Sequence, residues 1–349
     1  MRLWERLGAT ASAALAVDRE VKAPPASLHD PPPPPEPSAA EAELEDVRRL
    51  SAPTSGQPGS LVGDARARWR RTRYRDRLDA AIAAPRLGHC GTIAVISPKG
   101  GVGKTTITAL LGALFAYIRR DRVVAVDTNP DYGSLGPTLV PGHQVFVDDL
   151  LDLLEARELT VTELDAQLGR GPDGLMVLPA PTDPARMARL DRTAYARLIG
   201  HLQAKAGVIL LDCGTGLQEP AAQAAIAAAD QLVLVTDPDP ATGKLVARGA
   251  SLLLEAETPV VLVVNKMPRR HARSYLEQLG TLVPEAAGMT FIESNPAAAA
   301  RVSTGRFTWT DPAGGWDVRV RELGALLVSQ WPALGLTSGA PADTLSRQP

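Results

Sequence analysis

Residues 97–106 read SPKGGVGKTT, and this stretch decides the fold. A glycine-rich turn that runs into a helix offers backbone N–H groups to a phosphate, because no Cβ blocks the approach. Gly100, Gly101 and Gly103 open such a turn here. Lys104 then stands where its ammonium can reach the β and γ phosphates of a nucleoside triphosphate. The stretch therefore predicts a phosphate-binding loop.

The residues on either side supply the strand and the helix that such a loop requires. Residues 92–96 (TIAVI) are apolar and β-branched, as in a buried strand, and residues 106–117 (TITALLGALFAY) have the composition of a helix. The hydroxyl of Thr105 stands where these loops ligate Mg²⁺. We expect the nucleotide to contact one continuous set of residues: Lys99, Gly100, Gly101, Val102, Gly103, Lys104, Thr105 and Thr106.

A second lysine, Lys99, lies five residues before Lys104. With it, the loop resembles the deviant Walker A loop of the MinD/ParA family, which also includes the nitrogenase iron protein and the tail-anchored targeting ATPases. The resemblance covers about residues 90–330. It implies a SIMIBI-type P-loop ATPase with ATP and Mg²⁺ as cofactors. It also implies an ATP-dependent sandwich homodimer in which Lys99, the signature lysine, reaches the nucleotide of the partner.

Apolar runs of strand length alternate with helical segments after residue 91. The strand candidates are residues 92–96, 122–127, 175–178, 208–212, 231–236, 260–265 and 289–292, and the clearest helix candidates are 219–229, 241–257, 269–279 and 318–331. Continuous apolar runs are typical of parallel strands covered on both faces. We therefore predict an α/β fold with a doubly wound, mostly parallel sheet, helices on both faces, and an ATPase domain over residues 86–333.

A second candidate part of the site is the stretch 208–216, VILLDCGTG. Its apolar run ends in Asp212, which places a carboxylate at the carboxyl edge of a strand, where it can hold a Mg²⁺ water. Gly214 lets the backbone approach the γ phosphate. In the family this stretch corresponds to Walker B and the start of switch II.

Residues 123–131, VVAVDTNPD, align with the family's switch I, usually written DxDP. Asp127 matches the first aspartate and is a candidate magnesium ligand. Asn129 stands in place of the second, which in the family orients the attacking water. An amide can bind a water but cannot accept its proton, so we expect slow hydrolysis. Two alternatives stay open: Asp131 takes over the role, or Asn129 and Pro130 only shape the turn.

The stretch 260–268, VVLVVNKMP, bears on the identity of the base. Asn265 stands at the strand end where the family places an amide that contacts adenine. A guanine site of NKxD type would need a carboxylate at Pro268, so ATP is favoured over GTP. Pro296 falls where the family's last loop lies against the base. Alternatively, Asn265 caps the helix that follows.

The two ends of the chain differ from the middle, and we expect both to be largely disordered. The tail over residues 1–85 contains a proline-rich stretch (23–37), an acidic cluster (41–46) and an arginine-rich segment (66–77), and the second tail covers residues 334–349. The first of these tails, followed by the phosphate loop, resembles the corresponding part of the MinD-like ATPases associated with actinobacterial type VII (ESX) secretion.

The arginine-rich segment leaves several interpretations open. Seven arginines, Arg66 to Arg77, enclose Trp69 and Tyr74, and Asp76 lowers the segment's charge to +6. That charge suffices for several phosphate contacts on nucleic acid or on an anionic membrane. Alternatively, the segment is a helix that docks on the ATPase domain, a solvated face, a partner for the acidic cluster, or the site of an unknown partner protein.

The composition sets limits on function and location. The net charge of −2 gives no global attraction to nucleic acid or membranes, so such binding needs a local patch. Cys90 and Cys213 are isolated and lack zinc or CxxC spacing. Neither an apolar run of transmembrane length nor a signal peptide is evident. We expect a cytoplasmic protein, peripheral at most to membrane or nucleoid.

Three functional hypotheses follow. The first is a slowly hydrolysing ATPase that dimerises with ATP and positions or recruits a partner in secretion, partition or cell organisation. The second is an ATP-clamped scaffold with negligible turnover because of Asn129. The third is a partition ATPase that binds nonspecific DNA through the arginine-rich segment.

Overall fold

The computed structural model describes residues 61–129, 133–254, 257–311 and 316–338, with side chains from residue 69 onward. The chain divides into two units between Tyr74 and Arg75. Helix α3 (Leu61–Ala83) crosses this division. The described part of the first unit is the beginning of α3, and the second unit holds the sheet. The expectations for residues 23–37, 41–46 and 339–349 lie outside the described residues.

The second unit is built on one sheet whose strand order is β3-β4-β2-β5-β1-β6-β7-β8. All neighbouring strands run parallel except β3 and β4, which are antiparallel. The strands are β1 (Gly91–Ser97), β2 (Val123–Thr128), β3 (Gly169–Arg170), β4 (Met176–Leu178), β5 (Val208–Thr215), β6 (Gln231–Thr236), β7 (Val260–Met267) and β8 (Gly288–Glu293). The predicted fold class is thereby confirmed.

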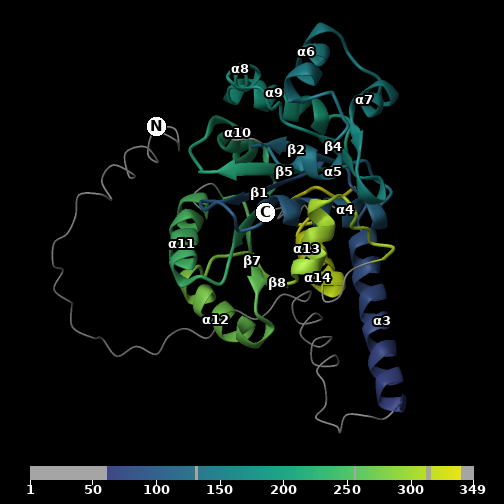
Figure 1. Ribbon diagram of the computed structural model, residues 1–349, viewed down its shortest axis with the longest axis vertical. Coiled ribbons are helices and arrows are strands. Elements are labelled where there is room, and N and C mark those ends of the chain that lie inside the picture. The colour runs from purple at the N-terminus through teal and green to yellow at the C-terminus, as the bar shows by residue number, and fades with distance from the viewer. Residues whose placement is uncertain (1–60, 130–132, 255–256, 312–315, 339–349) are drawn as a thin grey trace, which may run out of the picture. The chain divides into compact units, whose positions relative to one another are not determined.

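Helices cover both faces of this sheet. In Figure 1, α9 to α12 lie on one side, and α4 and α14 pack against each other on the other side. The helices of this unit are α4 (Lys104–Ile118), α5 (Leu135–Leu139), α6 (Val147–Ala156), α7 (Val161–Gln167), α8 (Pro184–Met187), α9 (Arg192–Gln203), α10 (Pro220–Ala228), α11 (Pro240–Leu254), α12 (Ala272–Leu282), α13 (Pro296–Ser303) and α14 (Trp316–Ser329), with 3₁₀ turns at Pro172–Gly174 and Arg269–His271.

The central strand β1 explains where a ligand can bind. All seven of its residues are buried, and the four at its centre, residues 93–96, form a continuous apolar run. The chain leaves β1 toward β2 on one side and later passes from β5 across β1 to β6. In open α/β sheets, ligands bind outside the carboxyl ends of the strands at such a reversal. The reversal lies at the carboxyl end of β1, where the loop 97–106 begins.

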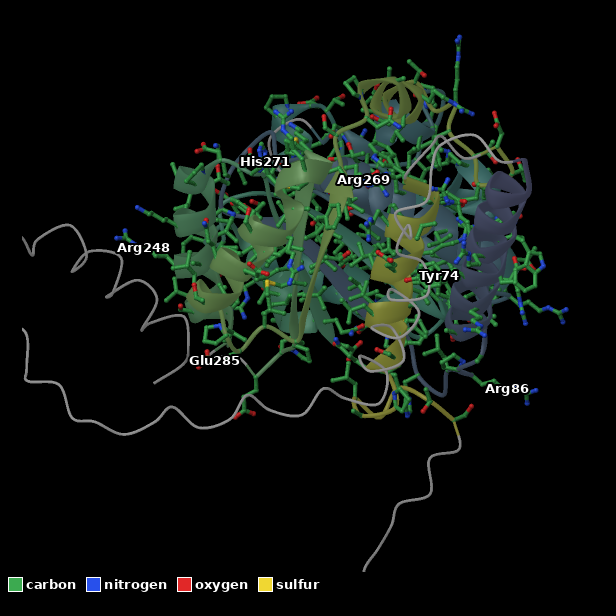
Figure 2. All side chains as sticks on the ribbon, turned by 90° about the horizontal axis from the view of Figure 1, so that it is seen from below. Tyr74, Arg86, Arg248, Arg269, His271 and Glu285 are labelled. Atoms are coloured by element: carbon green, nitrogen blue, oxygen red, sulfur yellow. The ribbon has the colours of Figure 1, made fainter. Side chains whose placement is uncertain are left out.

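The residues that flank the strands show at which side of the sheet the strands begin and at which side they end. Figure 2 shows Arg269 and His271, which follow β7, at the end opposite to Arg86 and Glu285, which precede β1 and β8. Parallel strands place all their carboxyl ends at one edge. The loops after β1, β2, β5, β6 and β7 therefore share one edge, and the candidate site is built there.

The packed core begins before residue 86, the domain boundary expected from the sequence. Leu78 and Ile82, on the last turns of α3, are buried. Asp79 accepts a hydrogen bond from Arg321 Nε of α14 at 2.6 Å. Arg119, after α4, donates from Nη1 to the Ile82 carbonyl at 2.6 Å. Leu78 and Ile82 are four residues apart and therefore lie on one face of α3.

The core also extends past residue 333, the other expected boundary. Leu336 is buried, and Thr337 forms an antiparallel bridge with Leu87. The Ser338 N–H donates to the Arg86 carbonyl at 2.9 Å. The end of the described chain is thus paired with the segment that leads into β1. No helix in the described ranges is long and apolar enough to cross a membrane.

Candidate nucleotide-binding site

The phosphate-binding loop joins β1 to α4 and needs glycine at two positions. Gly101 (φ 75°) and Gly103 (φ 98°) adopt left-handed conformations that other residues rarely take. A Cβ on Gly103 would also collide with the side-chain amide of Asn265. Gly103 directly precedes α4, so the loop presents its N–H groups at a helix N-terminus. This is the backbone arrangement that the sequence predicted for phosphate.

Lys104 is the first residue of α4, and its side chain is largely buried. Burial lowers its pKa, because desolvation disfavours the ammonium, while the nearby Asp212 carboxylate acts in the opposite direction. A bound triphosphate would add negative charge and favour the ammonium further. Thr106, the last residue of the predicted set, lies in the first turn of α4.

Asp127 at the end of β2 and Asp212 on β5 are direct neighbours in the sheet register. Burial raises the pKa of both carboxyl groups, and the charge of Asp212 raises that of Asp127 further. Two adjacent buried carboxylates need a compensating cation or a proton. The structure thus brings together the two aspartates that the sequence assigned to magnesium, although they are separated by 85 positions in the chain.

The oxygens around Asp212 fit a magnesium ion. Thr108 donates to Asp212 Oδ1 at 3.1 Å, and a hydrogen bond from Thr105 lowers the pKa of the same carboxyl group. The Thr105 hydroxyl also lies 2.9 Å from the hydroxyl of Ser134. Carboxylate and hydroxyl oxygens form the hard donor set that Mg²⁺ prefers, and a divalent cation would balance the buried charge. Thr105 and Asp212 are the residues that would hold it.

Asp127 is engaged differently, because backbone N–H groups surround its carboxylate. Oδ1 accepts from the Asn129 N–H at 3.1 Å, and Oδ2 accepts from the Leu135 N–H at 3.0 Å. A Cβ on Gly133 would collide with the same carboxylate. Asp127 therefore contacts described residues on both sides of residues 130–132, Asn129 before them and Leu135 after them. Asn129 is held at the start of the loop after β2 through its backbone, whereas Asp131 lies outside the described residues.

The end of β5 is packed against β2 through polar contacts. The Thr128 hydroxyl donates to the Asp212 carbonyl at 3.1 Å and lies 3.5 Å from Cys213 Sγ. Burial raises the pKa of the Cys213 thiol to about 12, so the thiol stays protonated. Gly214 is buried within β5. The next residue, Thr215, stands close to the phosphate loop, since a Cβ on Gly100 would lie 3.3 Å from Thr215 Cγ2.

The carboxyl end of β7 is tied to the phosphate loop. Asn265 is buried, and its Nδ2 donates to the Val102 carbonyl at 2.8 Å. Lys266 Nζ donates to the Gly101 carbonyl at 2.5 Å. The sheet register shifts between Val264 and Met267, and Lys266 has a φ of 57°. This bulge directs two successive side chains toward the loop.

The signature lysine, Lys99, is held within its own chain. Its Nζ donates to Asp239 Oδ2 at 3.2 Å and to Thr242 Oγ1 at 2.5 Å, and Asp237 Oδ2 lies at 3.9 Å. Asp239 precedes α11, and Thr242 lies in its first turn. About two fifths of the lysine side chain is exposed, at 39%. The structure thus places Lys99 between the phosphate loop and the segment that connects β6 to α11.

Pro296 is an exposed residue that opens α13 after β8. The preceding Asn295 caps this helix by accepting from the Ala298 N–H at 3.0 Å. β8 is separated from β1 by β6 and β7. Pro296 therefore shares the carboxyl edge with the site but belongs to its outermost strand.

Several residues that build the site carried no local sequence signal. They are the partners of Thr105, Lys99 and the loop carbonyls, namely Ser134, Asp237, Asp239, Thr242 and Lys266. Asp239 lies 140 positions from Lys99. Only the rule that parallel strands gather their carboxyl-end loops at one edge could have pointed to the segment after β6.

Comparisons with known proteins agree with this geometry. The family described as CobQ/CobB/MinD/ParA nucleotide binding domain matches residues 93–306. The ESX-1 secretion-associated protein EspI of Mycobacterium tuberculosis is 31% identical over 144 residues, which cover 41% of this chain and 21% of EspI. The septum site-determining protein MinD of Synechocystis is 34% identical over 178 residues, covering 50% of this chain and 64% of MinD. The matches thus span about a fifth of EspI and under two thirds of MinD.

The fold has a counterpart among solved structures. MinD of Pyrococcus horikoshii, complexed with Mg-ADP, superposes with a TM-score of 0.55 at 20% sequence identity. The superposition covers 70% of this chain and 97% of that one. At this identity the likeness concerns the fold. Since the family match spans more than half of the sequence and includes the phosphate loop, the chain belongs to the CobQ/CobB/MinD/ParA family of nucleotide-binding domains.

Proposed function

We propose that the chain is an ATPase that binds ATP with Mg²⁺, forms a homodimer while ATP is bound, and hydrolyses it slowly to ADP and phosphate. The observation that carries this proposal is the convergence of Lys104, Thr105 and Asp212 beside a glycine turn at the switch point of the sheet. This set matches the requirements of phosphoryl transfer, which depends mainly on positioning and charge stabilisation.

Each residue of the candidate site has a definable part in the proposed reaction. The N–H groups of the loop and the Lys104 ammonium bind the phosphates. Magnesium, when bound at Thr105 and Asp212, would neutralise charge on the β and γ phosphates. Asn129 orients the attacking water but cannot accept its proton. Turnover is therefore slow, and the ATP-bound state is long-lived.

In this proposal, the bound nucleotide determines whether the protein is a monomer or a dimer. The resemblance to the MinD/ParA family implies that Lys99 reaches across the dimer interface to the partner's nucleotide. In this structure Lys99 instead binds Asp239 and Thr242 of its own chain. Formation of the dimer requires that Lys99 exchange these contacts for phosphate oxygens of the second copy. A phosphate group competes well with a half-exposed carboxylate, because it offers more negative charge and more acceptors.

Calorimetric titration tests the nucleotide assignment. Lys104→Ala should abolish ATP binding, because it removes the charge that holds the β and γ phosphates. Lys244→Ala, which removes an exposed lysine on α11, is the matched control and should bind like the wild type. GTP should bind more weakly than ATP, since Pro268 offers no carboxylate to guanine. Unchanged ATP affinity in folded Lys104→Ala would refute the assignment.

The alternative of an ATP-clamped scaffold differs in one measurable quantity. A scaffold releases no phosphate on the time scale of its ATP occupancy, whereas a slow ATPase releases one phosphate for each ATP consumed. Single-turnover assays with radiolabelled ATP distinguish them. Sequence similarity to EspI supports a role in secretion, and similarity to MinD supports one in cell organisation. In either role we propose a cytoplasmic location, peripheral at most to the membrane or nucleoid.

A second candidate function, binding of nucleic acid or an anionic membrane, is favoured by the first unit. On α3, Trp69 is 60% exposed, and the Arg73 guanidinium lies 4.7 Å from its ring centroid. Arg70 and Arg71 are exposed as well. Exposed arginines next to an aromatic ring suit phosphate and base contacts, as in the partition hypothesis, or an anionic lipid surface.

Binding assays with duplex DNA and with phosphatidylglycerol vesicles separate these ligands. Arg70→Glu combined with Arg71→Glu should abolish binding to whichever polyanion the wild type recognises. Lys244→Glu with Arg248→Glu, both on α11, is the charge-matched control (Figure 2 labels Arg248). If the wild type binds neither probe at low salt, α3 serves a partner protein instead.

A further inference from the structure

The contacts of Lys99 depend on a short segment between β6 and α11, residues 237–239. Asp239 accepts from Lys99 through Oδ2, and through Oδ1 it accepts from the Ala241 N–H at 3.0 Å. The Asp239 N–H donates to Asp237 Oδ1 at 3.2 Å. The position of the carboxylate that binds Lys99 is therefore fixed by the conformation of this segment.

Tyr275 of α12 holds the same segment from the other side. Its hydroxyl donates to the Asp237 carbonyl at 2.9 Å and lies 3.5 Å from the Asp239 carbonyl. It also packs against the first turn of α11, because a Cβ on Gly243 would lie 2.7 Å from the Tyr275 oxygen. One hydroxyl thus contacts both the segment and the helix that supply the partners of Lys99.

Tyr275 is placed at the border of an open pocket rather than in the core. Residues of the β6–α11 segment, the end of β7 and α12 line this pocket: Pro238, Met267, Pro268, His271, Ser274, Tyr275 and Gln278. Removal of the tyrosine hydroxyl would therefore leave the ring and its packing in place. The losses would be the hydrogen bond to the Asp237 carbonyl and the hydroxyl's side-chain contact with Thr236 at the end of β6.

We propose that Tyr275 is a positioning residue for the signature lysine: by fixing residues 237–239, it determines how firmly Lys99 is held within its own chain. The expected effect on the dimer rests on the proposed function. If Lys99 binds the partner's nucleotide, a lysine that is held less firmly within its own chain is more available for that contact. The retention of Lys99 within one chain can be measured without nucleotide and without a dimer.

Lysine acylation followed by mass spectrometry tests this retention in the nucleotide-free, full-length chain. In Tyr275→Phe, Lys99 should react about three- to tenfold faster than in the wild type, the range expected for loss of one hydrogen bond. Exposed Lys244 in the same molecule is the internal reference and should not change. Tyr117→Phe, which alters a tyrosine on α4 that is 44% exposed, is the matched control. An unchanged Lys99 rate in Tyr275→Phe would overturn the proposal.

A second variant reaches the same contact without changing the tyrosine. Gly243→Ala places a methyl group against the Tyr275 hydroxyl and should also accelerate Lys99 acylation. Gly200→Ala on α9 has open space around the new Cβ and should leave the rate unchanged. If Gly243→Ala leaves Lys99 as protected as in the wild type, the position of the Tyr275 hydroxyl does not control Lys99, which would contradict the proposal.

The dimer provides a separate measurement. With ATP, Tyr275→Phe should dimerise at about three- to tenfold lower protein concentration than the wild type, because less binding within the chain must be given up. In a Lys99→Ala background the same substitution should have no further effect. Faster acylation without tighter dimerisation would leave the positioning role intact and would count against the use of Lys99 in the dimer, so the two failures are distinguishable.

Discussion

The side-chain amide of Asn265 donates a hydrogen bond to the Val102 carbonyl, 2.8 Å away, and thereby joins the end of β7 to the phosphate-binding loop. Asn265 is almost fully buried, at 4% exposure, and β6 separates its strand from β1. Next to Asn265 the strand has a bulge at Lys266, whose left-handed φ of 57° is uncommon for a residue other than glycine. The loop is thus preorganised by a residue that the sequence assigned to the base.

Asn265→Ala should weaken both the fold and the site. Loss of a buried hydrogen bond that leaves the Val102 carbonyl unpaired costs about 1 to 3 kcal/mol of unfolding free energy. ATP affinity should fall as well, because the loop loses its fixed conformation. Urea unfolding and calorimetry measure the two effects.

A capping residue on a different helix provides the control for Asn265→Ala. Asp191 caps α9 by accepting from the Ala194 N–H at 2.8 Å. Asp191→Ala should cost about 1 kcal/mol and leave ATP affinity unchanged. Equal ATP affinity in Asn265→Ala and the wild type would show that Asn265 supports only the fold.

The second prediction concerns turnover. Asn129→Asp introduces a carboxylate that can accept a proton from the attacking water and should raise the phosphate-release rate by about tenfold or more. Asp131→Ala should lower the residual rate only if Asp131 has taken over that role. Steady-state phosphate release from the wild type and both variants decides between a replaced base and a missing one. Rapid wild-type turnover that neither substitution alters would contradict slow hydrolysis.

The third prediction concerns the start of the folded core. Ile82, on the last turn of α3, is fully buried, and a Cβ on Gly324 of α14 would lie 3.1 Å from Ile82 Cδ1. Ile82→Ala should therefore reduce the unfolding free energy by about 2 to 5 kcal/mol. Leu282→Ala, at an aliphatic residue that is 50% exposed, should have a much smaller effect. Equal urea midpoints for the two variants would mean that α3 is not part of the stable core.

The sequence predicted the parts of the fold that depend on local pattern. Residues 208–212 were expected as a strand, and β5 spans Val208–Thr215, because a continuous apolar run suits a strand buried on both faces. The short antiparallel strand Gly169–Arg170 was not expected. Two residues carry too little periodicity to be distinguished from a turn.

In the candidate site, too, some residues could be predicted from the sequence and others could not. Lys104, Asp127 and Asp212 could be found because each ends a strand or opens a helix in a motif of fixed spacing. The binding of Lys99 by Asp239 could not, because it joins residues 140 positions apart through side chains. The structure also showed that Asp127 is surrounded by backbone N–H groups, whereas the sequence treated it as equivalent to Asp212 as a magnesium ligand.

The central claim is that ATP drives dimerisation through Lys99, and light scattering of the full-length chain with Mg²⁺ and either ATP or ADP tests it most directly. We predict a dimer with ATP and a monomer with ADP. Lys99→Ala should bind ATP within about tenfold of the wild type yet stay monomeric, because loss of a charged contact across an interface costs about 2 to 5 kcal/mol. A wild type that is monomeric with both nucleotides, or a Lys99→Ala variant that dimerises with ATP as the wild type does, would contradict the account.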